Sequence, residues 1–340
     1  MTVRATAHPQ RPLTIRDVAR HAGVSISTVS RVMNGKRVRP ELAVSVQQAL
    51  AELNFRPSAV ARSMVNGHTH TIGVLVEDIS SAYYAELIKG VERVLERTGQ
   101  HPLFKSSHWD AALEEEALGI FLDHNVDAII LVGGLLPEAR LTELAVRLPL
   151  VVVGRSDLHL NAPMLTLDQH GGGYQATRHL IDLGHRDIVH ICGRMTQEDA
   201  VARLQGYRDA LQDANLAIRP EFILEADFLE PSAYQAMSGF LEKEWPFTAV
   251  FAANDQMAMG AMLALHRRGL RVPDDVSLVG CDDLPRAAYL VPPLTTVRQP
   301  AQQLGEAAAQ AAHDLISGHA ALSSHQALTL VVRESTRSVR

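Results

Sequence analysis

A run of short polar side chains lies between residues 25 and 34, where the sequence reads SISTVSRVMN. Hydroxyl and amide groups can bond to phosphate oxygens, and an arginine among them can pair with O6 and N7 of guanine. If the run is helical, Val29, Val32 and Met33 form its inner face. The side chains left outside are Ile26, Ser27, Thr28, Ser30, Arg31 and Asn34. This set suits a helix in the major groove of DNA, and the alternative is an ordinary solvated face.

Two short helices joined by a tight turn are predicted to position these side chains, over the stretch LTIRDVARHAGVSISTVSRVM. Thr14 can cap the first helix, while Asp17 completes a capping box and meets the positive end of the helix dipole. Gly23 supplies the left-handed residue that the sharp turn needs, and Ser25 caps the second helix. The stretch therefore predicts a helix-turn-helix.

Charge is distributed unequally along the chain. Up to Asn66 there are ten Lys or Arg and three Asp or Glu, a net charge of +7. Taking these from the totals of 32 basic and 38 acidic residues leaves 22 and 35, a net charge of -13. A basic head on an acidic body means that only the head approaches phosphate, while the body is repelled.

Length and composition predict a soluble multidomain protein. The 340 residues, 46% of them hydrophobic, can bury two or three cores. No apolar run approaches the roughly 20 residues that span a membrane, and residues 1–12 resemble a disordered lead, without the apolar core of a signal peptide. The two cysteines lie far apart, which fits a reducing cytoplasm.

Enzyme and metal chemistry are not indicated by the sequence. The pairs His68 with His70 and His185 with His190 lack accompanying Cys or carboxylate clusters, so we expect solvated histidines and no metal site. Gly171–Gly173 matches no phosphate-loop pattern, and close helix packing explains it more simply. No nucleophile elbow stands out, and the adjacent Asp282 and Asp283 would point to opposite faces of a strand. We predict no catalytic residue and no cofactor.

Alternating strands and helices begin at residue 71. The apolar runs 71–76, 127–132, 150–153, 187–192, 248–253 and 276–280 are separated by helical stretches at 83–98, 111–124, 137–147, 172–183, 199–214, 233–243, 256–268 and 301–317. Such spacing predicts an α/β fold of βαβ units in parallel sheets, with ligands at the carboxyl ends of the strands. Because one sheet would not comfortably hold so many units, we place a division near 165–169, giving two lobes around a cleft.

A third helix and a hinge connect the helix pair to this body. The segment ELAVSVQQALAELNF is amphipathic and can close a three-helix head. Pro57 breaks that helix and can start another over PSAVARSM. A helix this short is marginal in water, so we expect it to become ordered only when DNA holds it.

The chain beyond its first dozen residues resembles the LacI/GalR family of bacterial transcription regulators. The resemblance rests on TIRDVARHAGVSISTVSRVMN in the head, PSAVARSM in the hinge, ARLQGYRDAL, ANDQMAMGAM, VPDDVSLVGCDD and PPLTTVRQP in the body. It implies a homodimeric repressor whose heads read half-sites of a pseudo-palindromic operator and whose hinge helices enter the minor groove. It also implies a two-lobed body, similar to periplasmic sugar-binding proteins, that binds a small sugar-like effector allosterically.

Carried over by position, the resemblance implies DNA contacts by Thr14, Ser25, Ile26, Ser27, Thr28, Ser30, Arg31, Asn34, Ala61, Arg62 and Met64. Ile26 departs from the pattern, because an aliphatic side chain can touch a thymine methyl but cannot hydrogen-bond. More of the discrimination should therefore fall on Arg31. Met64 stands where a leucine commonly wedges into the central base step.

For the effector, the resemblance implies contacts by Tyr83, Tyr84, Arg155, Arg203, Phe228, Asn254 and Asp282. Planar polar groups can grip adjacent hydroxyls, and aromatic rings can cover the apolar face of a sugar. Structural roles stay open at this point. Arg203 could pair with Asp199 four residues earlier, Asp282 could cap a loop, and Tyr84 and Phe228 could belong to the core.

The domain boundaries that follow are a disordered lead at 1–12, the helix-turn-helix at 13–56, the hinge at 57–70 and the effector body at 71–340. Lobe one comprises about 71–165 and 297–322, and lobe two about 166–296 and 323–340. Alternatives are a purine- or nucleoside-responsive regulator of the same architecture, a sugar-binding transport protein, which would need export, and a soluble α/β enzyme. We expect a cytoplasmic protein associated with the nucleoid.

Replacing Met64 by Leu should tighten operator binding. Methionine can unstack a base step as leucine does, but it is more flexible and loses more rotamer entropy when fixed. The comparison is a binding titration of the two proteins against one operator, and unchanged affinity would contradict it.

Overall fold

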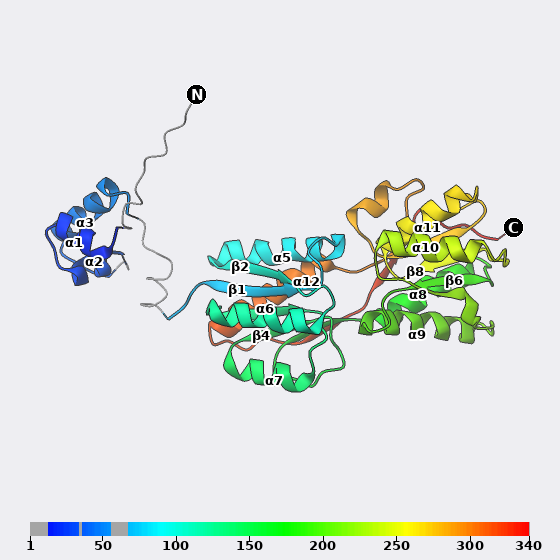
Figure 1. Ribbon diagram of the computed structural model, residues 1–340, viewed down its shortest axis with the longest axis horizontal. Coiled ribbons are helices and arrows are strands. Elements are labelled where there is room, and N and C mark those ends of the chain that lie inside the picture. The colour runs from blue at the N-terminus through cyan, green and yellow to red at the C-terminus, as the bar shows by residue number, and fades with distance from the viewer. Residues whose placement is uncertain (1–12, 34–35, 56–66, 340) are drawn as a thin grey trace, which may run out of the picture. The chain divides into compact units, whose positions relative to one another are not determined.

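The computed structural model describes residues 13–33, 36–55 and 67–339 (Figure 1). Contacts divide the chain into two units, residues 1–69 and 70–340, each described here by itself. Residues 57–66 of the predicted hinge at 57–70 lie outside the described residues. Within the described ranges, no helix combines the length and the apolar character needed to cross a membrane.

The first unit is a three-helix head, as the sequence predicts. Its helices are α1 (Ile15–His21), α2 (Ile26–Met33) and α3 (Pro40–Glu52). A small core of Val18, Ala19, Val29, Val46 and Ala49 lies among them. The predicted turn residue Gly23 has a φ of +67°, a conformation that side chains with a Cβ adopt rarely. The helix-turn-helix is therefore confirmed.

The second unit contains two six-stranded sheets, each with helices on both faces. The first sheet has the order β11-β5-β4-β3-β1-β2 and is parallel throughout. Its strands are β1 (Thr71–Val76), β2 (His101–Ser106), β3 (Ala128–Val132), β4 (Leu150–Val153), β5 (Met164–Leu167) and β11 (Ser324–Gln326). Its helices are α5 (Ala82–Thr98), α6 (Ala111–Asp123), α7 (Glu138–Arg147) and α12 (Ala301–Ile316).

The second sheet has the order β12-β10-β9-β8-β6-β7, with β12 antiparallel to β10. Its strands are β6 (Ile188–Cys192), β7 (Ile223–Glu225), β8 (Ala249–Ala252), β9 (Ser277–Asp282), β10 (Thr295–Arg298) and β12 (Thr329–Val331). Its helices are α8 (Gln169–Asp182), α9 (Glu198–Asp213), α10 (Glu230–Leu241) and α11 (Asp255–Arg267), with short 3-10 turns at Pro220–Phe222 and Pro285–Tyr289. The predicted α/β body with two parallel-rich sheets is confirmed.

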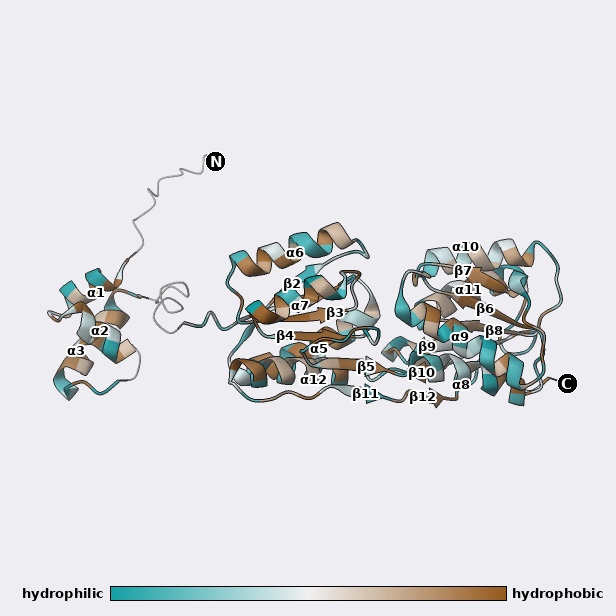
Figure 2. Ribbon diagram, turned by 90° about the horizontal axis from the view of Figure 1, so that it is seen from below, coloured by the Kyte–Doolittle hydropathy of each residue, from teal (hydrophilic) through white to brown (hydrophobic). Residues whose placement is uncertain are grey.

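Burial on both faces explains why the central strands read as continuous apolar runs. In β1, Ile72 and Val74 belong to the core shared with α5 and α12, whereas Leu75 belongs to the core under α6 and α7. Successive side chains of a strand point to opposite faces, so each face needs its own apolar residues. Figure 2 shows the result, with strands such as β3 and β4 coloured as hydrophobic between mixed helices.

The chain passes between the sheets three times, after β5, after β10 and after β11. Three of the sequence boundaries need correction. Residues 166–167 and 324–326 lie in strands of the first sheet, and residues 297–298 lie in β10 of the second. The lobe to which a short strand belongs depends on the strand with which it pairs. For β11 that partner is β5, more than 100 residues earlier in the sequence.

The strands that the sequence does not predict are mostly edge strands or short ones. β2 carries Pro102, which a sheet tolerates at its edge because proline donates no ladder hydrogen bond. β7, β11 and β12 have three residues each. Three residues are too few to show an alternating pattern.

His190 is a buried histidine in the centre of β6, where the sequence predicts a solvated one. It is fully buried, and its ring stacks on Tyr207 at 5.0 Å and on Phe251 at 4.6 Å. Its Nδ1 lies 3.0 Å from the carbonyl oxygen of Phe251, so Nδ1 carries the proton of a neutral ring. Burial lowers the pKa of His190 to about 3. His185 is buried as well.

Replacing His190 by Phe should reduce the acid sensitivity of the body. The unfolded chain binds a proton near pH 6.5 and the folded His190 does not, so the histidine costs stability as the pH falls below 6.5. We expect the loss in unfolding free energy between pH 7.5 and 5.5 to be smaller by about 1 kcal/mol in His190→Phe. The measurement is chemical denaturation at both pH values, with the exposed His159→Phe as control. Equal losses in all three proteins would refute this.

Candidate nucleic-acid interface and ligand cleft

The caps of the helix pair place α2 as the sequence predicts. The Asp17 carboxylate accepts hydrogen bonds from the Thr14 backbone N–H at 2.8 Å and from its hydroxyl at 2.7 Å. The Ser25 hydroxyl accepts from the backbone N–H of Thr28 at 3.1 Å. In α1 the Asp17 carboxylate thus satisfies the N–H of the residue that precedes the helix, and in α2 the Ser25 hydroxyl satisfies one of the first N–H groups.

The outer face of α2 presents the side chains predicted to contact DNA. Ser25, Ile26, Ser27 and Arg31 are exposed, and Ile26 has a fractional exposure of 45%. Thr14, Thr28 and Ser30 are half-buried. The Ser25 hydroxyl also lies 2.8 Å from that of Ser27 and 2.9 Å from that of Thr28, so these hydroxyls form one cluster. Asn34, Ala61, Arg62 and Met64 lie outside the described residues.

A cavity lies between the two lobes of the body, at the carboxyl ends of both sheets' strands. Six of the seven predicted effector residues line it: Tyr83, Tyr84, Arg203, Phe228, Asn254 and Asp282. Seven further lining residues were not predicted: Glu77, Ser81, Trp109, Gln197, Asp199, Leu229 and Gln299. Arg155 instead lines a second cavity, which shares Glu77, Tyr83 and Tyr84 with the first.

Close packing of α8 on α9 places Arg203 in the cleft. A Cβ on Gly173 would lie 2.2 Å from the Arg203 carbonyl oxygen, and one on Gly206 would lie 2.1 Å from that of His170. Glycine is therefore needed at both crossing points. This packing explains Gly173 of the glycine run at 171–173, whereas a Cβ on Gly172 would meet Leu328 and one on Gly171 would meet the Asp168 carboxylate.

A buried network of four side chains, here called the Arg203–Asp282 network, runs along the cleft. Arg203 Nε donates to Gln169 Oε1 at 2.9 Å, and Gln169 Nε2 donates to Gln299 Oε1 at 2.9 Å. Gln299 Nε2 then donates to Asp282 Oδ1 at 2.6 Å. All four side chains are at least nine-tenths buried. Gln169 and Gln299 follow the first two passages between the sheets, so the network joins the cleft to these passages.

Arg203 pairs with Asp199, a structural role that the sequence left open, and it has further partners. Its guanidinium donates to the Ala253 carbonyl at 2.6 Å and lies 3.6 Å from Asp199 four residues earlier. It also lies over the Phe228 ring at 6.0 Å. Its charge is thus already compensated by the protein.

Phe228 and Asn254 support each other at the wall of the cleft. Asn254 Oδ1 caps α11 by accepting from the Met257 N–H at 2.8 Å, and its Nδ2 donates to the Phe228 carbonyl at 2.9 Å. Phe228 has a φ of +72°, and its ring occupies the space that a Cβ on Gly193 would fill. Asn254 is therefore both a helix cap and a lining residue.

The first lobe contributes an aromatic pair and a buried carboxyl group. The rings of Tyr83 and Tyr84 meet edge to face at 5.3 Å. The Tyr84 hydroxyl donates to Glu77 Oε2 at 2.6 Å, and the Gly134 N–H donates to Oε1 at 3.3 Å. Burial raises the pKa of Glu77 to about 7, and the Tyr84 hydrogen bond offsets part of that rise.

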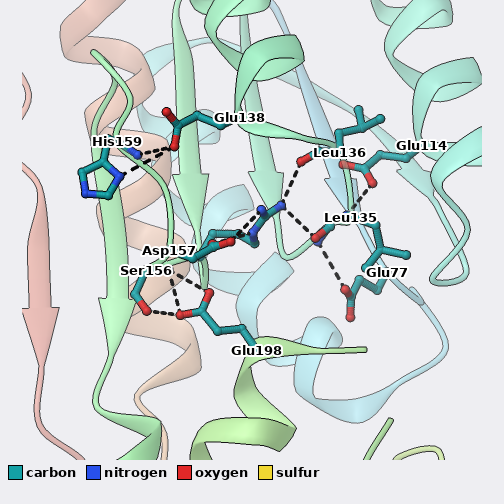
Figure 3. Close-up of polar contacts among 11 residues, drawn as sticks. Glu77, Glu114, Leu135, Leu136, Glu138, Ser156, Asp157, His159 and Glu198 are labelled. Carbon is teal, nitrogen blue, oxygen red and sulfur yellow. Dashed lines mark hydrogen bonds and ion pairs between the residues drawn. The ribbon is translucent and has the colours of Figure 1, made fainter. Parts of the chain in front are cut away.

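Arg155 stabilises loops of the first lobe. It donates to the carbonyl oxygens of Gly134 at 3.0 Å and Leu136 at 3.2 Å, and it pairs with Asp157 at 3.1 Å. Figure 3 shows these loops around Leu135 and Asp157. In this structure the guanidinium therefore shapes the second cavity.

Two hydrogen-bonded contacts join the lobes across the cleft. The Ser156 N–H donates to Glu198 at 3.0 Å, and its hydroxyl also contacts that carboxylate (Figure 3). On the other side, the Ser81 hydroxyl donates to Gln256 Oε1 at 2.9 Å, and both residues are buried. These contacts favour the angle between lobes seen here.

Some of the unpredicted lining residues carried a sequence signal. Asp199 was identified only as a partner for Arg203, and Gln299 lies inside the PPLTTVRQP motif. Glu77 follows an apolar strand, a position where ligands of parallel sheets bind. Trp109 lies in a loop after β2, a strand that was not predicted.

A helix-turn-helix head with a two-lobed, cleft-forming body defines a class of DNA-binding regulators controlled by ligands. Residues 14–58 match the model of bacterial regulatory proteins, lacI family, and residues 177–336 match the periplasmic binding protein-like domain. The ribose operon repressor of Haemophilus influenzae is 39% identical over 298 residues, covering 87% of this chain and 90% of the relative. A PurR transcriptional repressor of Histophilus somni is 38% identical, covering 86% and 89%. The chain belongs to the LacI family of bacterial transcriptional repressors.

Solved structures agree with this assignment. The lac repressor dimer bound to operator and an anti-inducer has a TM-score of 0.86 and 28% identity, covering 96% of this chain and all of that one. A LacI family regulator from Enterococcus faecium with bound ribose has a TM-score of 0.73 and 26% identity, covering 79% of this chain and all of that one.

Replacing Glu77 by Gln should weaken the alkaline loss of stability. A buried carboxyl group with a raised pKa keeps its proton longer in the folded chain, so its ionisation costs stability as the pH rises from about 4.5 through 7. The drop in unfolding free energy from pH 5 to pH 8 should be smaller by about 2 kcal/mol in Glu77→Gln. Denaturation curves at both pH values, with the exposed Glu96→Gln as control, test this. An equal drop in Glu77→Gln and the parent would show that Glu77 does not titrate as described.

Proposed function

We propose that this protein is a homodimeric transcriptional repressor that binds a pseudo-palindromic operator and is controlled by an uncharged sugar-like effector in the cleft. The observation that carries the proposal is the Arg203–Asp282 network. Arg203 and Asp282 can hold a ligand. The network joins them through Gln169 and Gln299, which lie where the chain passes between the lobes. A ligand that favours one lobe angle would shift the equilibrium between arrangements of the dimer.

The head supplies the DNA-binding part of this proposal. The exposed hydroxyls of α2 would bond to phosphates, and Arg31 would read a guanine. The arginines Arg16, Arg20, Arg31, Arg37 and Arg39 are exposed on the same small unit. A half-site on each of two heads fits the symmetry of a dimer, and a related repressor is described as a dimer bound to operator.

The charges around the cleft favour an uncharged effector. The carboxyl groups of Glu77, Asp199 and Asp282 line the cavity, whereas the Arg203 guanidinium already contacts Gln169, Ala253 and Asp199. Burial already raises the pKa of Glu77, Asp199 and Asp282, so an added phosphate or carboxylate would place a further negative charge beside groups whose ionisation is costly, while hydroxyls could hydrogen-bond to them in either protonation state. A relative named for the ribose operon and a neighbour with bound ribose support a sugar. A purine or nucleoside is the second candidate, because other relatives are named PurR.

Binding without turnover completes the proposal. The protein would act in the cytoplasm, at the nucleoid, and would release its ligand unchanged. A transport role is less favoured, because the basic head would have no use in it.

The function is tested by selecting DNA fragments with the full-length protein and measuring anisotropy with and without D-ribose or adenosine. We expect palindromic fragments, binding that weakens steeply with salt, and an affinity for DNA that one ligand changes at least about fivefold. Mass spectrometry should recover that ligand unchanged. Fragments without symmetry, or a consumed ligand, would overturn the proposal.

Replacing Arg31 by Ala should remove much of the operator preference. A bidentate contact to guanine discriminates by about 1–3 kcal/mol, so competition between operator and random DNA should lose roughly tenfold or more. Arg20→Ala is the matched control, because Arg20 is exposed on α1. Preference that survives Arg31→Ala would mean that other side chains read the bases.

A further inference from the structure

Trp109 is rigidly placed in the cleft by a short loop between β2 and α6. The loop is anchored to the end of β1, because the backbone N–H groups of Ser107 and His108 donate to the carbonyls of Val76 at 3.0 Å and Glu77 at 2.7 Å. After the tryptophan, Asp110 caps α6 by accepting from the Ala112 N–H at 2.7 Å. The backbone on both sides of Trp109 is thus held by hydrogen bonds.

The indole N–H of Trp109 is buried without a hydrogen-bond acceptor. It lies close enough to Glu77 to lower the pKa of that carboxyl slightly, but the geometry of a hydrogen bond is not met. A buried Trp N–H usually finds a partner, and leaving that hydrogen bond unmade destabilises the folded chain. Because Trp109 lines the cavity, an oxygen of a bound molecule would satisfy this donor.

A side chain of the second lobe packs on the Trp109 ring. Arg194, which follows β6 of the second lobe, lies over the Trp109 ring at 4.9 Å and pairs with Asp227 at 3.7 Å. This cation–π contact joins the lobes beside the cavity. The ring face is therefore engaged by the protein, and the edge that carries the N–H is left for a ligand.

Three of the ten described non-glycine residues with a positive φ angle line the same cavity. Trp109, Phe228 and Asp282 all line it, and their φ angles are +57°, +72° and +129°. Left-handed backbone is costly for bulky residues and persists where the surrounding structure enforces it, typically at ligand sites. Phe228 and Asp282 were already expected to contact the effector, and Trp109 shares their unusual conformation.

We infer that Trp109 is an effector-binding residue, whose indole N–H donates a hydrogen bond to an oxygen of an uncharged, hydroxylated ring. The inference rests on the proposed function and narrows its ligand. Glu77, Asp199 and Asp282 around the same cavity disfavour a negatively charged oxygen and favour hydroxyl donors. A free sugar and a nucleoside share this chemistry.

The test uses the full-length protein carrying Trp245→Phe, in which Trp109 is the remaining tryptophan. Trp245 packs against Phe240 and is absent from the lining of the cleft cavities among the described residues. The probes are D-ribose and adenosine, with D-ribose 5-phosphate and AMP as charged counterparts. At least one uncharged probe should bind and change the Trp109 emission, and its phosphate ester should bind about 100-fold more weakly.

A second variant, Trp109→Phe with Trp245 retained, separates the loss of the indole hydrogen bond from the loss of ring packing. It retains a ring under Arg194 but removes the N–H, so the affinity for the uncharged probe should fall about tenfold. Because the substitution removes an unpaired buried donor, the melting temperature without ligand should not fall below the parent value. Trp245→Phe is the matched control and should bind the probe with parent affinity.

Several outcomes overturn the inference. These are parent affinity in Trp109→Phe, a Trp109 emission that stays constant at saturation, a phosphate ester that binds more tightly than its parent, or binding of none of the four probes. Failure of the inference leaves ligand-controlled DNA binding intact, since that is measured separately in the same proteins. A parent protein that binds no operator would instead refute the proposed function.

Discussion

The buried Arg203–Asp282 network is the constraint on which the rest of the body depends. A guanidinium taken out of water is expensive unless each N–H finds a partner, and Arg203 finds them on Gln169, Ala253 and Asp199. These partners lie on three different elements, α8, the end of β8 and α9. Any change in how α8 meets α9 therefore disturbs the cleft.

That network ends at the segments through which one lobe continues into the other. Gln169 begins α8 directly after the first passage, and Gln299 follows β10 at the second. The Ser156–Glu198 and Ser81–Gln256 contacts cross the cleft between them. A ligand in the cavity thus touches groups whose hydrogen bonds also depend on the angle between the lobes, which is the physical requirement for coupling.

Local patterns made the head predictable almost residue by residue. Its caps, its turn glycine and its inner face depend on contacts between neighbours three or four residues apart, so Thr14, Gly23 and Val29 occupy the places expected of them. The cleft was predicted less fully. Six of its side chains were identified, but Arg155 stabilises loops of the first lobe, and Trp109 lies beside a strand that no periodicity revealed.

The sequence alone determined the helices and six of the strands, the charge asymmetry between head and body, the close packing at Gly173 and the family of the protein. Each of these depends on the order and type of nearby residues. Only the tertiary structure decided which lobe takes β11, that His190 is buried and neutral, and that Trp109 presents an unpaired N–H beside Glu77. These depend on partners far away in sequence, and the free energy of a buried polar group is set by those partners.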